Sequence, residues 1–212
     1  MLPDKRPLLI GITGNIGSGK SSVSKQIQAE GYRVVNADEC AHQVLYSDDL
    51  VASLQKRWGS GIFRDGEIDR QSLAKIVFSS KADLEYLNSM IHPLVLKAFD
   101  HIVSISTDDY LFFEVPLLFE ANLERCFDFI VLVTSPLDQR IKRVQERDHA
   151  DDESTLARMA NQIDDIDKLN KVDLLINNDS TFDALQKTVR IFLGDLKNIQ
   201  HRTIINFFTD QQ

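Results

Sequence analysis

The segment from Gly14 to Ser22, GNIGSGKSS, contains the residue types that bind phosphate. It fits the pattern GxxxxGK[ST], in which glycines allow successive backbone amides to turn toward phosphate oxygens. A lysine at this spacing reaches the β- and γ-phosphates of a nucleotide, and the hydroxyl that follows is a ligand for Mg²⁺. The residues expected to bind ATP here are Gly14, Gly17, Ser18, Gly19, Lys20, Ser21 and Ser22. We therefore predict an ATP or GTP site in which Lys20 is catalytic and Ser21 holds the metal.

Buried parallel strands are expected around this loop. The apolar run LLIGIT precedes it, and a helix should follow to about Glu30, closed by Gly31. Four further strands are predicted in YRVVNAD ending at Asp38, DYLFFEV ending near Val115, FDFIVLVT and VDLLINN. Helical segments separate them, which predicts an α/β fold with a five-stranded parallel sheet and helices on both faces. Ligands should gather at the carboxyl ends of the strands.

Two helical regions interrupt the alternation of strands and helices. Residues 39–108 carry helix signals, a turn signal at Asp65-Gly66, and Pro93, which should start or kink a helix. Residues 136–170 are helical and polar, and the acidic stretch DHADDES is expected to form an exposed turn. We interpret the first region as an insert that binds the acceptor of a phosphoryl group, and the second region as a lid over the nucleotide. Both belong to a single unit, residues 1–212, with a three-layer P-loop nucleotide-kinase fold.

Composition narrows the range of partners. A net charge of −8 argues against a broad surface for nucleic acid, which favours positive charge. No stretch approaches the ~18 apolar residues that a membrane span needs. Cys40 and Cys126 are far apart and lack partners at metal spacing, so we expect reduced thiols. These features favour a cytoplasmic protein that acts on small molecules and binds neither nucleic acid nor membrane.

Among users of a phosphate loop, the sequence favours a small kinase. Switch GTPases usually carry DxxG after the third strand and an NKxD loop, and neither is found at the expected places. Motors and remodelling ATPases need a longer chain. A nucleoside or nucleoside-monophosphate kinase remains an alternative, although a phosphate acceptor would favour more arginines in the insert. A non-catalytic nucleotide switch is a second alternative, and it would need an element that senses the γ-phosphate.

Several blocks in order along the chain resemble the dephospho-coenzyme A kinase family. They are GITGNIGSGKSSV, NADECAH, DGEIDRQSLAKIVF, IHPLV, EVPLLFE and VDLLINN. The resemblance spans nearly the whole chain and implies Mg²⁺-dependent transfer from ATP to the ribose 3′-hydroxyl of dephospho-coenzyme A, the last step of coenzyme A synthesis. Departures from the common family pattern occur at Asn15, Ser22, Asn36 and Asp179. Asn tolerates left-handed backbone well, so Asn15 need not disturb the loop.

The resemblance also implies the residues of the acceptor side. The family residue that matches Asp38 contacts the acceptor ribose, where a carboxylate can orient or deprotonate the hydroxyl. Asp38 could also cap a helix that starts at Glu39. Arg70, His92 and Glu120 match family positions and are expected to bind the acceptor, with structural roles as the alternatives.

The helical segment after the fourth strand supplies arginines to the donor side. Arg140, Arg143 and Arg147 are spaced by three and four residues and so share one helical face. They form either a solvated basic face or a lid over the triphosphate, in which Arg140 is the first candidate for catalysis. Glu114, near the end of the third strand, is expected to hold Mg²⁺ through water or to be a structural carboxylate.

Overall fold

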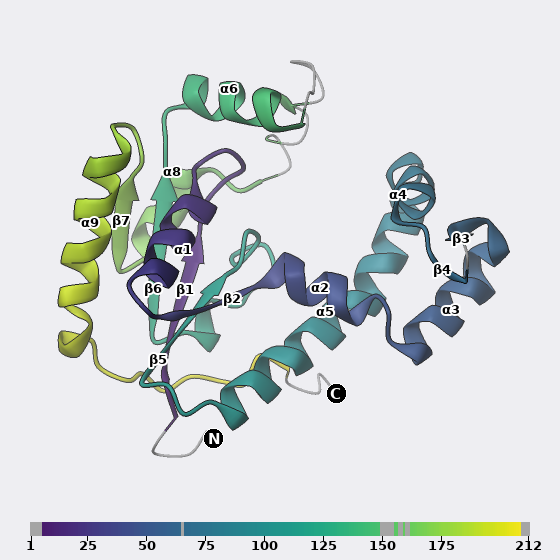
Figure 1. Ribbon diagram of the computed structural model, residues 1–212, viewed down its shortest axis with the longest axis horizontal. Helices are drawn as coiled ribbons and strands as arrows, with labels where there is room; N and C mark the ends of the chain where they lie inside the picture. Colours follow the sequence, from purple (N-terminus) through teal and green to yellow (C-terminus); the bar gives the residue numbers. More distant parts are fainter. Residues whose placement is uncertain (1–5, 65, 149–154, 157–158, 160–161, 209–212) are drawn as a thin grey trace.

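Five parallel strands form the centre of the computed structural model, which describes residues 6–64, 66–148, 155–156, 159 and 162–208. In spatial order they are β2 (Arg33–Asn36), β5 (Tyr110–Glu114), β1 (Leu8–Thr13), β6 (Phe129–Thr134) and β7 (Leu174–Asn177). All six residues of β1 are buried, as expected for a strand with neighbours on both sides. The predicted parallel sheet is confirmed, and its carboxyl ends meet at one edge (Figure 1).

Helices cover both faces of the sheet. The two on one face are α1 (Lys20–Ala29) and α9 (Phe182–Gly194). They pack on alternate strand residues such as Leu8 and Ile10, together with Val23 and Val189. The other face buries Leu9 against Phe99 of α5 (Lys81–Ile105). The predicted three-layer α/β fold is therefore present.

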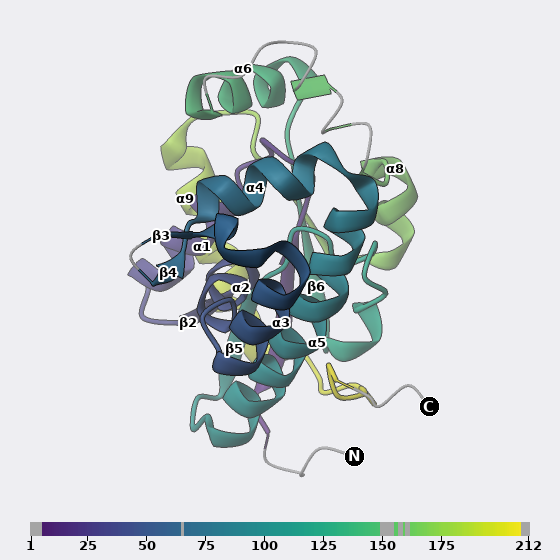
Figure 2. The same cartoon turned by 90° about the vertical axis from the view of Figure 1, so that its right-hand side faces the viewer.

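The region between β2 and β5 forms a helical projection beside the sheet (Figures 1 and 2). Its elements are α2 (Ala37–Val44), α3 (Asp48–Trp58), a 3-10 turn (Gly59–Ile62), β3 (Phe63–Arg64), β4 (Glu67–Ile68), α4 (Arg70–Ser79) and α5. A small core of its own includes Leu50, Leu54 and Leu87. The two-stranded antiparallel pair β3–β4 was not predicted. Pro93 lies inside α5, so of its two predicted effects the helix start is wrong and the kink stays a prediction.

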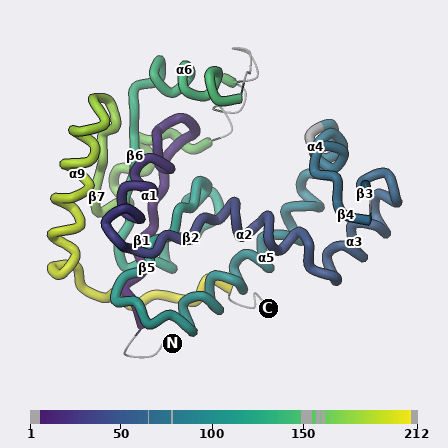
Figure 3. The backbone as a smooth tube through the Cα atoms, in the orientation of Figure 1, coloured from purple at the N-terminus to yellow at the C-terminus, as the bar shows by residue number. Residues whose placement is uncertain are grey.

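The lid region contains α6 (Leu137–Asp148), α8 (Asp165–Lys168) and a 3-10 turn (Leu169–Lys171). In Figure 3, α6 lies above the loop between β1 and α1. The predicted acidic turn falls on residues 149–154, which are outside the described residues. Shorter 3-10 turns are found at Glu124–Cys126 and Leu196–Asn198. Among the helices of the described part, none is long and apolar enough to cross a membrane.

Candidate active site

The phosphate loop connects the buried end of β1 to α1, which begins at Lys20. The Lys20 side chain is 8% exposed, and its Nζ donates to the carbonyl oxygens of Gly14 at 2.6 Å and Asn15 at 3.3 Å. Burial lowers the pKa of Lys20 to about 8, and the charges of Glu114 and Asp38 oppose this shift. The loop therefore holds a desolvated cation on which the carboxylates of Glu114, at the end of β5, and Asp38 act.

Glycines in the loop are required by what packs against them. Gly17 has φ 80, and a Cβ there would lie 2.6 Å from the carbonyl oxygen of Arg140 at the start of α6. Gly19 has φ 93, and a Cβ there would collide with the side-chain amide of Asn178. That amide donates to Ser18 O at 2.9 Å. The loop is thus enclosed by α6 on one side and by the end of β7 on the other.

A cavity of about 390 Å³ opens at this edge of the sheet. Its walls come from the phosphate loop, the start of α2, the segment after β5, α6 and the end of the lid region. They are formed by Ile16, Gly17, Gly19, Lys20, Ser21, Ser22, Asp38, Glu114, Pro116, Leu117, Arg143, Val144, Arg147 and Gln162. Most of the predicted donor residues therefore line one cavity with Asp38 and Glu114, although they are far apart in sequence, whereas Gly14, Ser18 and Arg140 are not among its lining residues.

Ser21 and Glu114 contact each other within the cavity wall. The Ser21 hydroxyl donates to Glu114 Oε1 at 3.2 Å, and the carboxylate itself is buried. A hydroxyl beside a carboxylate is an all-oxygen donor set of the kind that Mg²⁺ prefers. These two residues fit a magnesium site adjoining the phosphate loop.

Asp38 lies in the first turn of α2 and not at the end of a strand. The strand β2 stops at Asn36, whose side-chain oxygen accepts from the backbone amides of Asp38 at 2.8 Å and Glu39 at 3.1 Å. Asn36 is thus the helix cap, and the two predictions that Asp38 ends the strand and that Asp38 caps the helix are wrong. Asn36 pairs in register with Glu114, so the side chain of Asp38 still enters the same cavity as Glu114.

The three arginines of α6 have different environments. Arg140 is buried, and its Nε donates to Ile16 O at 3.0 Å while its guanidinium pairs with Asp165 at 3.6 Å. Arg143 donates to Gly17 O at 3.2 Å and to Asn178 O at 3.1 Å. Arg147 is exposed and pairs with Asp148 at 2.6 Å. Arg143 and Arg147 line the cavity, and Arg140 lies behind the loop.

Comparison with known proteins relates this geometry to a family. Residues 8–184 match the sequence model of a family described as Dephospho-CoA kinase. A protein named Dephospho-CoA kinase from Fusobacterium nucleatum subsp. nucleatum is 34% identical over 186 residues, covering 87% of this chain and 96% of its own. The chain belongs to the dephospho-CoA kinase family. The resemblance noted in the sequence is thereby confirmed.

Solved structures agree with this family membership. A Thermus thermophilus protein described as TT1252 has a TM-score of 0.78 and 32% identity, with 91% of this chain and 99% of that chain covered. A dephospho-CoA kinase from Campylobacter jejuni has a TM-score of 0.67 and 25% identity, with 90% and 97% covered. The predicted P-loop kinase fold is therefore confirmed over nearly the whole chain.

The acceptor-side residues expected from the dephospho-CoA kinase resemblance do not all meet at the cavity. Arg70 opens α4, and its guanidinium donates to His42 Nε2 of α2 at 3.0 Å. His92 lies on α5, where partial burial of the ring lowers its pKa. Glu120 accepts from Ile163 N at 3.0 Å and so faces the lid region. Their roles stay predictions.

Four further residues adjoin the dephospho-CoA kinase site and were not singled out from the sequence. Gln162 lines the cavity, Asn178 holds the phosphate loop, His42 contacts Arg70, and Lys168 is buried behind the loop. His42 stands in the block NADECAH and Asn178 in the block VDLLINN, so both lie within motifs that carry the family resemblance. Gln162 and Lys168 gave no local signal, because the loop residues that they contact are more than a hundred residues away.

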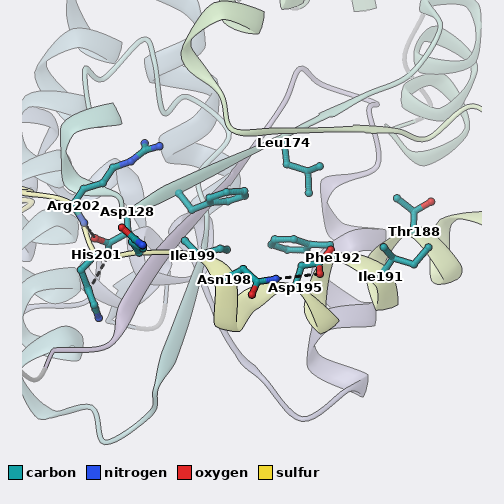
Figure 4. A pocket seen from close by; sticks show the side chains of 12 residues that line it. Asp128, Leu174, Thr188, Ile191, Phe192, Asp195, Asn198, Ile199, His201 and Arg202 are labelled. Carbon is teal, nitrogen blue, oxygen red and sulfur yellow. Dashed lines mark hydrogen bonds and ion pairs between the residues drawn. The ribbon is translucent and has the colours of Figure 1, made fainter.

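A larger cavity, about 800 Å³, is elsewhere (Figure 4). It lies where β6 and β7 begin, beside Phe192 of α9 and at the opposite edge of the sheet from the phosphate loop. The residues predicted for the dephospho-CoA kinase site do not line it. Its size alone therefore does not make it the site of the chemistry.

Proposed function

We propose that the protein transfers the γ-phosphoryl group of ATP to the ribose 3′-hydroxyl of dephospho-CoA, the final step of coenzyme A biosynthesis, at the 390 Å³ cavity. One observation carries the assignment of roles: Lys20 and Ser21 of the donor loop line the same cavity as Asp38. The reaction needs a phosphate-binding group facing a group that can act on a hydroxyl. The two halves are supplied by α1 and α2.

On the donor side, loop amides and Lys20 bind the triphosphate and stabilise the charge of the transferred group. Ser21 and Glu114 hold Mg²⁺, supported by their 3.2 Å contact and by the oxygen-only donor set. The metal, when bound, supplies positive charge to the β- and γ-phosphate oxygens. Because the attacking group is an ordinary hydroxyl, this protein's own residues position and stabilise, and no covalent enzyme intermediate is needed.

On the acceptor side, Asp38 orients the 3′-hydroxyl and accepts its proton. The alternative is purely local, since an acid in the first turn of α2 also stabilises that helix. The location of its side chain in the cavity wall favours the role in the reaction. Glu114 is a less suitable base because its carboxylate is engaged by Ser21.

Arg70 binds an anionic part of the acceptor, and dephospho-CoA provides one in its diphosphate. Support comes from the contact with His42, whose Nε2 accepts from the Arg70 guanidinium and so holds it beside α2. His42 stands one helical turn beyond Asp38 on α2, about 6 Å along the axis. That spacing is on the scale of a ribose ring, which would set a 3′-hydroxyl at Asp38 and phosphate oxygens near Arg70. His92, on α5, contacts a more distant part of the acceptor.

The arginines of α6 act from above the donor. Arg143 and Arg147, in the cavity wall, cover the triphosphate and exclude water. Arg140 acts on the transferred group through the loop backbone that its Nε holds. Glu120 is best supported as an anchor for the lid region, because its carboxylate accepts from Ile163 N.

The chain works as one unit in which residues 39–108 receive the acceptor and residues 136–170 form the lid. Support for a single unit comes from Ala37 and Ala41 of α2, which pack with Val95 and Phe99 of α5 into the core below the sheet. We also assign the protein to the cytoplasm. Its two buried cysteines, Cys40 and Cys126, are free thiols, as is usual in a reducing compartment.

One coupled assay tests the proposed reaction. ADP release is measured with ATP and Mg²⁺, with and without dephospho-CoA, and CoA is identified as the second product. Release that needs the acceptor and matches CoA formation supports the proposal. Equal release without the acceptor, or release with a nucleoside monophosphate in its place, overturns it.

A further inference from the structure

The end of the lid region crosses the phosphate loop before the chain enters β7. This return segment, residues 162–168, makes three contacts with the first half of the loop. Gln162 Oε1 accepts from Ile16 N at 2.7 Å, and Asn15 Nδ2 donates to Ile163 O at 3.1 Å. Asn15 Oδ1 accepts from Lys168 Nζ at 2.5 Å. The loop and the return segment are thus joined by side chains from both sides.

Lys168 is the most deeply buried of these groups, with 1% of its residue surface exposed. Besides Asn15, its ammonium contacts Glu120 Oε1 at 3.5 Å. Glu120 in turn accepts from Ile163 N, at the other end of the return segment. A buried ammonium is costly unless it is paired and hydrogen-bonded, so its position depends on both partners. Lys168 therefore links the phosphate loop, the return segment and the segment after β5.

Asn15 owes its place to its side chain. Among the described non-glycine residues, the positive φ belongs to Asn122, so Asn15 does not use the left-handed conformation that asparagine tolerates. Its residue surface is 4% exposed, and both ends of its amide are engaged, one by Ile163 and one by Lys168. A glycine here would leave Lys168 without one partner.

The consequence for the site follows from Gln162. Gln162 lines the cavity that contains Lys20 and Asp38, and its side-chain oxygen accepts from Ile16 N. Six residues after Gln162, Lys168 donates to Asn15 of the phosphate loop, and this contact holds the return segment in position. Movement of the segment would remove one wall from the phosphate cavity and admit water.

We propose that Lys168 and Asn15 are positioning residues that clamp the return segment onto the phosphate loop, so that Gln162 closes the donor side against water. This inference rests on the proposed kinase reaction and adds a further set of residues to it. Neither side chain needs to touch substrate. A merely structural pair would stabilise the fold without affecting how ATP is divided between acceptor and water.

The test is a double-mutant cycle with Asn15→Ala, Lys168→Met and the double variant. Lys187→Met and Asn198→Ala are matched controls on α9 and the 3-10 turn after it, far from the loop. Three quantities are measured: the Kd for ADP by displacement of a fluorescent nucleotide, the ratio of acceptor-independent ADP release to CoA formation, and the melting temperature.

Each single variant should weaken ADP binding roughly tenfold, as expected for loss of a hydrogen bond to a charged group. Each should also raise the ratio of hydrolysis to CoA formation severalfold. The double variant should be no worse than the poorer single variant, because both break the same clamp. Additive effects, or an unchanged hydrolysis ratio, would overturn the proposal, whatever happens to the melting temperature.

If Lys168→Met folds poorly because it removes the cation beside Glu120, the comparison of Asn15→Ala with Asn15→Gln decides, because glutamine keeps an amide that can accept from Lys168. Restoration of the hydrolysis ratio by Asn15→Gln supports the clamp, and equal ratios in the two variants sink it. ADP binding is measured without acceptor, so failure of the wild-type protein to form CoA would count against the proposed function alone.

Discussion

The hydroxyl of Ser21 donates to the carboxylate of Glu114 across 3.2 Å, from the first turn of α1 to the last residue of β5. These two elements meet because β5 pairs directly with β1, the strand that leads into the phosphate loop. The contact joins the loop to the acidic end of the neighbouring strand. These two oxygen donors would hold a metal ion there, and its positive charge would stabilise the phosphate oxygens.

Glu114→Gln should therefore raise the Mg²⁺ concentration needed for half-maximal activity by about tenfold, since one full negative charge is lost from the metal site. The measurement is a Mg²⁺ titration of CoA formation at saturating ATP. Glu30→Gln, which alters an exposed pair with Arg190, serves as the control and should leave the titration unchanged. An identical titration for Glu114→Gln would make this carboxylate structural.

Asp38→Asn should lower kcat for CoA formation by roughly 10²–10⁴, the range for a lost general base, with the Kd for ATP nearly unchanged. Asparagine keeps the shape of the side chain and removes its proton affinity. Glu39→Gln is the matched control, because Glu39 is the other acid in the first turn of α2. Similar losses in both variants would mean that the acids act on the helix and not on the hydroxyl.

Nucleotide binding should weaken as the pH rises through about 8. Burial lowers the pKa of Lys20 to about 8, against the opposing charges of Glu114 and Asp38, so the ammonium is present below this pH and lost above it. Bound phosphate favours the charged form, and linkage then requires affinity to fall with rising pH, by up to about tenfold per pH unit. ADP binding measured across this range checks the sign. Lys20→Arg should remove the dependence, since arginine stays charged.

Arg70→Ala should raise the KM for dephospho-CoA by about tenfold and leave the KM for ATP unchanged, because Arg70 lies on α4, away from the donor loop. Lys75→Ala tests the same helix at an exposed position and should change neither constant. An effect of Arg70→Ala on the KM for ATP instead would assign this residue to the donor.

Contiguous motifs made the donor half predictable. The strand, loop and helix from Leu8 to Ala29 are consecutive in sequence, so the pattern of each element indicates where the next one begins. The boundary at Asn36 was missed because a capping asparagine after a strand looks like strand until its side chain is seen bonded to Asp38 N. The hairpin β3–β4 was missed because strands of two residues carry no periodic pattern.

Side-chain contacts between residues far apart in the chain could not be predicted from the sequence pattern. The periodicity of α6 correctly put three arginines on one face, but it could not tell that Arg140 would be buried behind the loop and Arg147 exposed. Asn15 and Lys168 are 153 positions apart, and only the fold brings them together. Sequence thus indicated candidate groups for the proposed reaction, while the side chains that hold these groups in place were found only in the structure.

The buried carboxylate of Asp128 should control stability rather than activity. Its side chain is 0% exposed, and it accepts from Arg6 Nη2 at 2.7 Å, Leu9 N at 2.8 Å and Arg202 N at 2.7 Å. Burial alone would raise its pKa, but these hydrogen bonds and the charge of Arg6 hold the pKa below its usual value. Because the folded-state pKa is depressed, the stabilisation is present above the unfolded pKa and is lost as the pH falls through the folded value.

Asp128→Asn should then cost on the order of 3–5 kcal/mol at neutral pH by leaving Arg6 buried and unpaired. Urea unfolding at neutral and acidic pH measures this, with Asp109→Asn on the surface as the control. The gap between Asp128→Asn and wild type should shrink at acidic pH, and a gap independent of pH would contradict the role of the charge.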